Sequence, residues 1–261
     1  MKFTDSHCHL DFPELAQQLK PELADCFELA IERIIVPAVN PDNWQPVLEI
    51  TSKVPSNVLL FPCLGIHPWY LNELTEQHLM ALEQTALNYQ ERIVAIGETG
   101  IDGKIAIEQN NMEKQKEFFR YQLELANRLN KPVIVHHRRS HNEVIEILKQ
   151  SPVKRGGIIH AFSGSYQQGK TYIDMGFKLG IGGTITYERA KKTINAIKRF
   201  PVGALVLETD APSMPLSGEQ GTTNKPSNIK VIFQQLVNVL QCEPEKLAEQ
   251  IEQNIDQLFF R

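Results

Sequence analysis

Two imidazoles stand two residues apart near the start of the chain, His7 and His9, within Asp5-Ser6-His7-Cys8-His9. Residues 3–9 are predicted to form a strand, in which alternate side chains share a face. Both imidazoles would then point the same way, with Cys8 on the other face. Neutral imidazoles bind divalent metals when other elements supply the remaining ligands. The pair indicates half of a metal site, although isolated His-x-His pairs also occur on surfaces by chance.

Four more side chains with metal-binding atoms follow apolar runs elsewhere in the chain. Glu98 follows the run at 93–97, where an unpartnered buried carboxylate would be costly, so we expect a metal or a cation beside it. His136 and His160 end two further runs, and we expect both to be metal ligands. Asp210 follows the last run and is placed to ligate metal and to accept the proton of an attacking water.

Three further residues are open to two interpretations each. His67, in Gly-Ile-His-Pro, is either a capped strand end or an imidazole that supports the metal centre or faces a substrate phosphate. Arg138 shares the face of His136 and is either a structural ion-pair partner or a substrate anchor. Glu208 lies two residues before Asp210 and is expected to support the site, either as an inner-layer partner or as a salt-bridge acid, rather than to take part in the chemistry.

Eight apolar runs are predicted as strands and alternate with amphipathic helical patterns. The strands are expected at 3–9, 34–39, 58–66, 93–98, 133–137, 157–162, 177–185 and 205–209, and four of the helices at 112–129, 166–175, 230–240 and 243–259. Eight such units in 261 residues predict a single (β/α)8 barrel domain over 1–261. A doubly wound sheet is the alternative, but it usually opens with a glycine-rich turn that this chain lacks. Because active sites of such barrels lie at the C-terminal ends of the strands, the ligand residues should meet at one rim.

Composition limits the classes of partner. The 27 basic and 31 acidic residues give a net charge of −4, whereas proteins that hold nucleic acid by bulk electrostatics are usually basic. Any phosphate-bearing substrate must therefore be held locally. Four widely spaced cysteines argue against a disulfide framework and a thiolate zinc site. No signal sequence or membrane-spanning segment is evident, so we expect a cytoplasmic protein without a membrane or obligate protein partner.

An ordered set of motifs spans most of the chain. It consists of Asp-x-His-Cys-His-Leu at 5–10, Gly-Ile-His-Pro at 65–68, Gly-Glu-Thr-Gly-Ile-Asp at 97–102, Pro-Val-Ile-Val-His-x-Arg at 132–138, His-Ala-Phe-Ser-Gly at 160–164 and Glu-Thr-Asp-Ala-Pro at 208–212. The set resembles the TatD-type deoxyribonucleases, a branch of the amidohydrolase-like TIM barrels.

The resemblance implies a divalent-metal-dependent hydrolase that cleaves DNA phosphodiester bonds with metal-activated water. It implies metal ligation by His7, His9, Glu98, His136, His160 and Asp210, and catalytic roles for Asp210, Glu98 and His67. Glu98 would bridge where two ions bind, and His67 would face the substrate phosphate. Zinc, manganese and magnesium all suit such donors. The DNA substrate would be single-stranded or presented at an end.

Two departures from the family pattern bear on the substrate. The family's aromatic after the Asp102 position is replaced by Gly103-Lys104, and its Arg-Asn-Glu-Pro appears as Thr223-Asn224-Lys225-Pro226. We expect these positions to line the substrate mouth. Their change leaves open a hydrolase of a small phosphoester or of a cyclic amide or lactone, and a non-catalytic metal or nucleic-acid binding protein is a third alternative.

Overall fold

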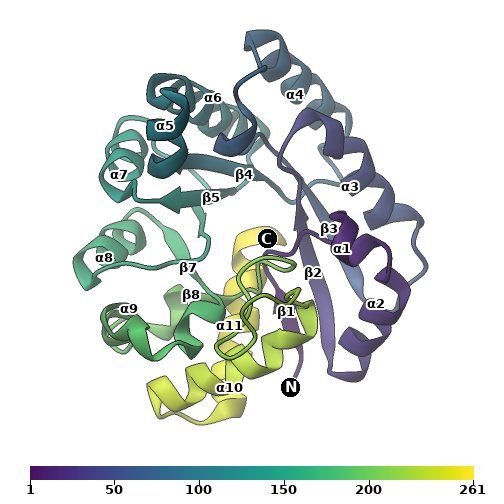
Figure 1. Ribbon diagram of the computed structural model, residues 1–261, viewed down its shortest axis with the longest axis vertical. Coiled ribbons are helices and arrows are strands. Elements are labelled where there is room, and N and C mark those ends of the chain that lie inside the picture. Colours follow the sequence, from purple (N-terminus) through teal and green to yellow (C-terminus); the bar gives the residue numbers. More distant parts are fainter.

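A computed structural model describes all residues from 1 to 261 and shows a ring of eight parallel strands that pair in chain order (Figure 1). The strands are β1 (Phe3–Asp5), β2 (Ile31–Pro37), β3 (Leu59–Leu64), β4 (Ala95–Asp102), β5 (Val133–Arg138), β6 (Gly157–Ile159), β7 (Phe177–Ile181) and β8 (Leu205–Leu207). The ring closes between β8 and β1, where Ser6 N donates to Leu207 O at 2.9 Å. The predicted (β/α)8 barrel is confirmed.

Helices surround the ring and connect successive strands (Figure 1). They are α1 (Pro13–Ala16), α2 (Leu19–Glu28), α3 (Pro41–Lys53), α4 (Glu76–Asn88), α5 (Gly103–Gln109), α6 (Met112–Leu129), α7 (His141–Gln150), α8 (Tyr166–Asp174), α9 (Lys191–Ile197), α10 (Ile229–Leu240) and α11 (Pro244–Phe259), with short 3₁₀ turns at Pro68–Tyr70, Gly183–Thr186, Glu188–Ala190, Val202–Ala204 and Pro226–Asn228. None of these helices combines the length and the apolarity that a membrane crossing requires.

The predicted helices agree closely with those observed, because their end signals are local. Helix α6 covers the predicted residues, and Asn130 ends it in the left-handed conformation at φ 52°. Ser165 caps α8 by accepting a hydrogen bond from Gln168 N, and Gly176 follows that helix with φ 87°.

The predicted strands differ most at their C-terminal ends. Strand β1 ends at Asp5, so His7 and His9 lie in irregular chain beyond it, and β7 ends at Ile181 instead of residue 185. Strand β4 is longer than predicted and reaches Asp102. Hydrogen-bonded pairing ends where the strands diverge at the rim, and the apolar runs that the sequence shows do not mark that point.

The interior of the ring is a small apolar core that α11 closes at the end opposite the rim. Side chains from strands β2, β3, β4, β5, β6 and β8 pack there against the last turns of α11. This core contains Ile35, Cys63, Ala95, Ile134, Ile158, Val206, Ile255, Leu258 and Phe259. Apolar side chains therefore fill this part of the interior, and the predicted ligands lie at the other end of the barrel.

Candidate metal centre

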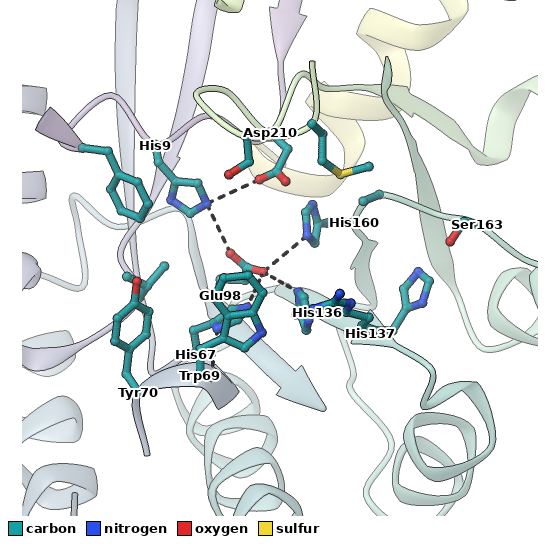
Figure 2. Close-up of a pocket in the computed structure, with 16 residues that line it drawn as sticks. His9, His67, Trp69, Tyr70, Glu98, His136, His137, His160, Ser163 and Asp210 are labelled. Atoms are coloured by element: carbon teal, nitrogen blue, oxygen red, sulfur yellow. Dashed lines mark hydrogen bonds and ion pairs between the residues drawn. The ribbon is translucent and has the colours of Figure 1, made fainter. Parts of the chain in front are cut away.

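The six predicted ligands meet at the C-terminal rim, where the carboxylate of Glu98 lies among the others; Figure 2 shows all of them except His7. Glu98 Oε2 lies 3.2 Å from His7 Nε2 and 3.4 Å from His9 Nε2. Its Oε1 lies 3.1 Å from His136 Nδ1 and 3.3 Å from His160 Nε2. The two oxygens thus face different pairs of imidazoles, and this arrangement would let one carboxylate bridge two cations.

Asp210 completes the cluster from the opposite side. Its Oδ1 lies 3.5 Å from both His7 Nε2 and His9 Nε2. His7, His160 and Asp210 form one group of donor atoms within 4.8 Å of one another, and His7, His9 and Glu98 form another. The structure therefore offers more than one place where a metal ion could be held.

The protonation of His9 tests whether these residues fit a metal. His9 Nδ1 lies 3.1 Å from the carbonyl oxygen of Pro37. Because a carbonyl only accepts, Nδ1 carries the hydrogen, and the Nε2 of the neutral ring has a free lone pair. That Nε2 lies 3.1 Å from His7 Nε2, while His7 Nδ1 is buried without a partner. Two nitrogens and two carboxylates aimed at one small space need a shared cation or extra protons, so the donor set fits a divalent metal.

His67 has the opposite tautomer to His9. Its Nδ1 accepts the backbone N–H of Trp69 at 3.1 Å, so the hydrogen of the neutral ring is on Nε2. Nε2 faces Glu98 Oε1 at 3.2 Å. Burial lowers the pKa of His67 to about 4, which keeps the ring neutral. In this state His67 can donate a hydrogen bond but cannot ligate a metal through Nε2.

Asp102 supports His136, a role that the sequence did not reveal. Its Oδ2 lies 3.2 Å from His136 Nε2, which leaves Nδ1 of that imidazole to face Glu98. Oδ1 caps α5 by accepting from Lys104 N and Ile105 N, each at 2.9 Å. A carboxylate behind a metal-binding imidazole sets its tautomer and orientation. The position four residues after Glu98 on one strand was the available signal.

Glu208 has the corresponding place behind His160, as its predicted supporting role requires. Its Oε1 lies 3.4 Å from His160 Nδ1 and accepts the backbone N–H of Ala161. A side chain at Gly180 would collide with this carboxylate. The glycine in β7 therefore makes room for a buried acid.

Burial and charge compete throughout the cluster. Burial opposes the charged forms, but Glu98, Glu208 and Asp210 together raise the pKa of His160 to about 9. Burial would also raise the pKa of Glu98, yet the imidazoles of His67, His160 and His7 lower it well below its usual range. Without a metal, the cluster holds its carboxylates ionised and some of its imidazoles protonated.

A cavity of about 390 Å³ opens above the cluster. Its lining includes the aromatic residues Phe12, Trp69 and Tyr70, of which Figure 2 labels the last two, and Arg138 is the one Lys or Arg side chain in the lining. The sequence did not single out the three aromatic residues, because each belongs to a loop whose direction only the tertiary structure sets.

Neither Gly103-Lys104 nor the segment 223–226 lines this cavity, contrary to expectation. Gly103 and Lys104 instead begin α5. Asn224 is buried and donates to Thr209 O at 2.9 Å and to Ser213 O at 2.8 Å. Lys225 Nζ pairs with Glu22 Oε1 at 2.8 Å, on the side of α2. The segment 223–226 therefore supports the loop after β8. Its direction follows from the hydrogen bonds that Asn224 donates to carbonyl groups of that loop.

Comparison with known proteins gives a consistent result. A family model described as TatD related DNase matches residues 4–260. An uncharacterized metal-dependent hydrolase of Haemophilus influenzae is 38% identical, over 99% of this chain and 100% of its own length. The crystal structure of YjjV, a TatD homolog of Escherichia coli, superposes with a TM-score of 0.93 at 36% identity, and the match covers 98% of this chain and 97% of that one. The relatives that resemble this chain are named metal-dependent hydrolases, and the chain therefore belongs to the TatD family.

Proposed function

We propose that the protein is a divalent-metal-dependent deoxyribonuclease that hydrolyses DNA phosphodiester bonds. The observation that carries this proposal is the convergence of four imidazoles and two carboxylates at the floor of one open cavity. His7, His9, Glu98, His136, His160 and Asp210 would hold the ions, with Glu98 shared between two of them. Divalent ions would supply a Lewis acid that neutralises charge on the phosphorus oxygens and lowers the pKa of water. The family description TatD related DNase supports the substrate class.

Asp210 is the proton acceptor in this proposal. Its side chain is 14% exposed whereas that of Glu98 is 3% exposed, so Asp210 reaches further towards the cavity. Burial opposes its charge, but His160, His9 and His7 lower its pKa, so it is ionised at neutral pH and able to take a proton. Its backbone is held at φ 58°, an unfavourable region for a residue with a side chain, and such strain collects at functional sites.

His67 and Arg138 are the donors that would orient a phosphate. The N–H of His67 Nε2 lies at the cavity wall, next to the carboxylate of Glu98. Arg138 also lines the cavity, with a side chain that is 43% exposed. Its nearest carboxylate oxygen, Asp102 Oδ2, is 3.8 Å away, so most of its donors remain available.

A small phosphoester is the second candidate substrate. The observation that favours it is the scarcity of basic side chains, because Arg138 is the single Lys or Arg in the lining. A long polyanion usually needs several such contacts.

The test is degradation of single-stranded DNA by metal-stripped protein to which Mg²⁺, Mn²⁺ or Zn²⁺ is returned. Release of nucleotides by the wild type but not by Asp210→Asn would support the nuclease. Intact DNA together with metal-dependent cleavage of bis-4-nitrophenyl phosphate would overturn it in favour of the second candidate. Intact DNA and intact ester with bound metal would reject both.

A further inference from the structure

We propose that Trp69 is a stacking surface for an unpaired nucleobase of the substrate, one sugar away from the phosphate at the metal centre. This inference rests on the proposed function and assigns a base-binding place to the same cavity. It concerns residues that neither the predicted ligand set nor the family motifs contain.

Trp69 is exposed in a way that needs an explanation. The side chain is 45% exposed, although it belongs to a short 3₁₀ turn directly after His67. Tyr70 beside it is 39% exposed, and both line the cavity. Large exposed aromatic side chains grouped at one cavity mark a binding surface more often than isolated ones do.

The indole is also held rigidly. Trp69 Nε1 donates to Asp102 Oδ2 at 2.6 Å, and Asp102 is itself fixed by His136 and by the start of α5. A rigid ring loses little conformational entropy when a ligand packs on it. Trp69 therefore supplies a rigid aromatic surface beside Asp102.

The neighbours of the indole leave it available for stacking. His67 meets it at 5.3 Å between ring centroids with an interplanar angle of 85°, and His136 at 6.3 Å with 76°. Both arrangements are edge-to-face, so no aromatic side chain stacks parallel on the indole. Figure 2 shows Trp69 in front of His67 and Glu98, on the same side of the cluster as Tyr70. A planar ring that enters the cavity could lie on the indole while its attached phosphate reaches the metal centre.

The charged groups beside the indole indicate which kind of planar ligand would bind there. Arg138 Nη1 lies 3.8 Å from the same Asp102 oxygen that receives the indole N–H. An aromatic face and a guanidinium with free donors therefore flank one carboxylate. A planar ring joined through a sugar to a phosphate matches both, and this is the chemistry of a nucleotide.

The experiment compares two ligands that differ only in the base. Deoxyadenosine 5′-monophosphate and deoxyribose 5-phosphate contain no phosphodiester bond, so the metal-supplied protein can be titrated with each by calorimetry. We expect the nucleotide to bind about tenfold more tightly, as one base–aromatic stack provides. Trp69→Ala should abolish this preference and leave the affinity for deoxyribose 5-phosphate within about twofold.

Two variants separate stacking from structural support. Trp69→Phe keeps an aromatic face but loses the hydrogen bond to Asp102, and it should retain most of the preference for the nucleotide. Trp44 is buried and donates to Gly65 O at 2.8 Å, so Trp44→Phe leaves Trp69 as the one tryptophan reporter. In that variant the nucleotide should quench the fluorescence and deoxyribose 5-phosphate should not.

Equal affinity of the two ligands for the wild type, or binding of neither, would overturn the base site. An equal loss of affinity for both ligands in Trp69→Ala and Trp69→Phe would also overturn it, because Trp69 would then act only by holding Asp102. If DNA is cleaved but the two ligands bind equally, the proposed nuclease function stands and the base site is rejected. If the nucleotide is preferred but DNA is not cleaved, the base site stands and the nuclease function is rejected.

Discussion

Both carboxyl oxygens of Asp5 accept hydrogen bonds from Thr209, and this contact joins the first and last strands at the rim. Asp5 Oδ1 accepts from Thr209 N at 3.0 Å, and Oδ2 lies 2.5 Å from Thr209 Oγ1. Oδ1 also accepts from the backbone N–H of His7 at 3.1 Å. Regular strand pairing has ended here, since β1 stops at Asp5 and β8 at Leu207. The pair thus holds His7 beside Asp210, whose N–H donates to His7 O at 2.9 Å.

Thr209→Val should destabilise the protein by about 1–3 kcal/mol, because it leaves a buried carboxylate oxygen of Asp5 without its hydroxyl partner. Urea unfolding measures the change in the free energy of unfolding. Thr223→Val makes the same chemical change at an exposed residue and should alter stability by less than about 0.5 kcal/mol. Equal unfolding midpoints for Thr209→Val and the wild type would show that the pair does not hold the closure.

Asp210→Asn should reduce hydrolysis by about 10²-fold or more while the protein stays folded, since it removes a proton acceptor and a charged ligand but little volume. The measurement is the initial rate on DNA or on a small phosphoester at saturating metal. Asp174→Asn, at an exposed site paired with Lys170, is the matched control and should retain full activity. Wild-type turnover by Asp210→Asn would refute its role.

Asp102→Asn should weaken metal binding by about 10- to 100-fold without removing a ligand, because the carboxylate behind His136 orients that imidazole. Asparagine can still cap α5, so helix content should not change. A competition titration with a chromophoric chelator gives the affinity, and circular dichroism checks the fold. Unchanged metal affinity would mean that His136 does not depend on Asp102.

The metal-free protein should lose stability as the pH rises from about 7 to 9. The native pKa of His160 is raised from its ordinary value of 6.5 to about 9, so the protonated native form is favoured at low pH and this contribution is lost as the pH passes 9. Burial raises the pKa of Asp5 to about 8, so deprotonation of Asp5 in the same pH range also lowers the stability of the native protein. Bound metal replaces these protons, so the loaded protein should show a flatter profile. Thermal unfolding across this range, with and without chelator, tests the difference; parallel profiles would contradict it.

Arg138→Gln should weaken DNA binding at all sequences and reduce the slope of log affinity against log salt by about 1, as expected for a lost phosphate contact. KM for an oligonucleotide at several salt concentrations measures both. Thr223→Arg should change neither quantity, because residues 223–226 lie outside the lining of the cavity. A larger salt slope in Thr223→Arg would place that loop on the path of the DNA.

The sequence by itself determined the barrel and the membership of the central cluster. Parallel strands bring their C-terminal ends to one rim, so polar residues that follow successive apolar runs must come together whatever their distance along the chain. This rule brought Glu98, His136, His160 and Asp210 to one place, together with His7 and His9. Helix ends such as Ser165 and Asn130 were equally predictable, because capping depends on a few adjacent residues.

Only the tertiary structure decided what each imidazole can do and what lines the cavity. The tautomers of His9 and His67 depend on Pro37 O and Trp69 N, which loop geometry places, and no spacing rule reveals them. The direction of Lys225 towards Glu22, away from the cavity, likewise depends on how the loop after β8 satisfies its buried polar groups. Local patterns predict which face of an element is polar. Hydrogen-bond partners from distant segments determine where a particular proton or aromatic ring lies.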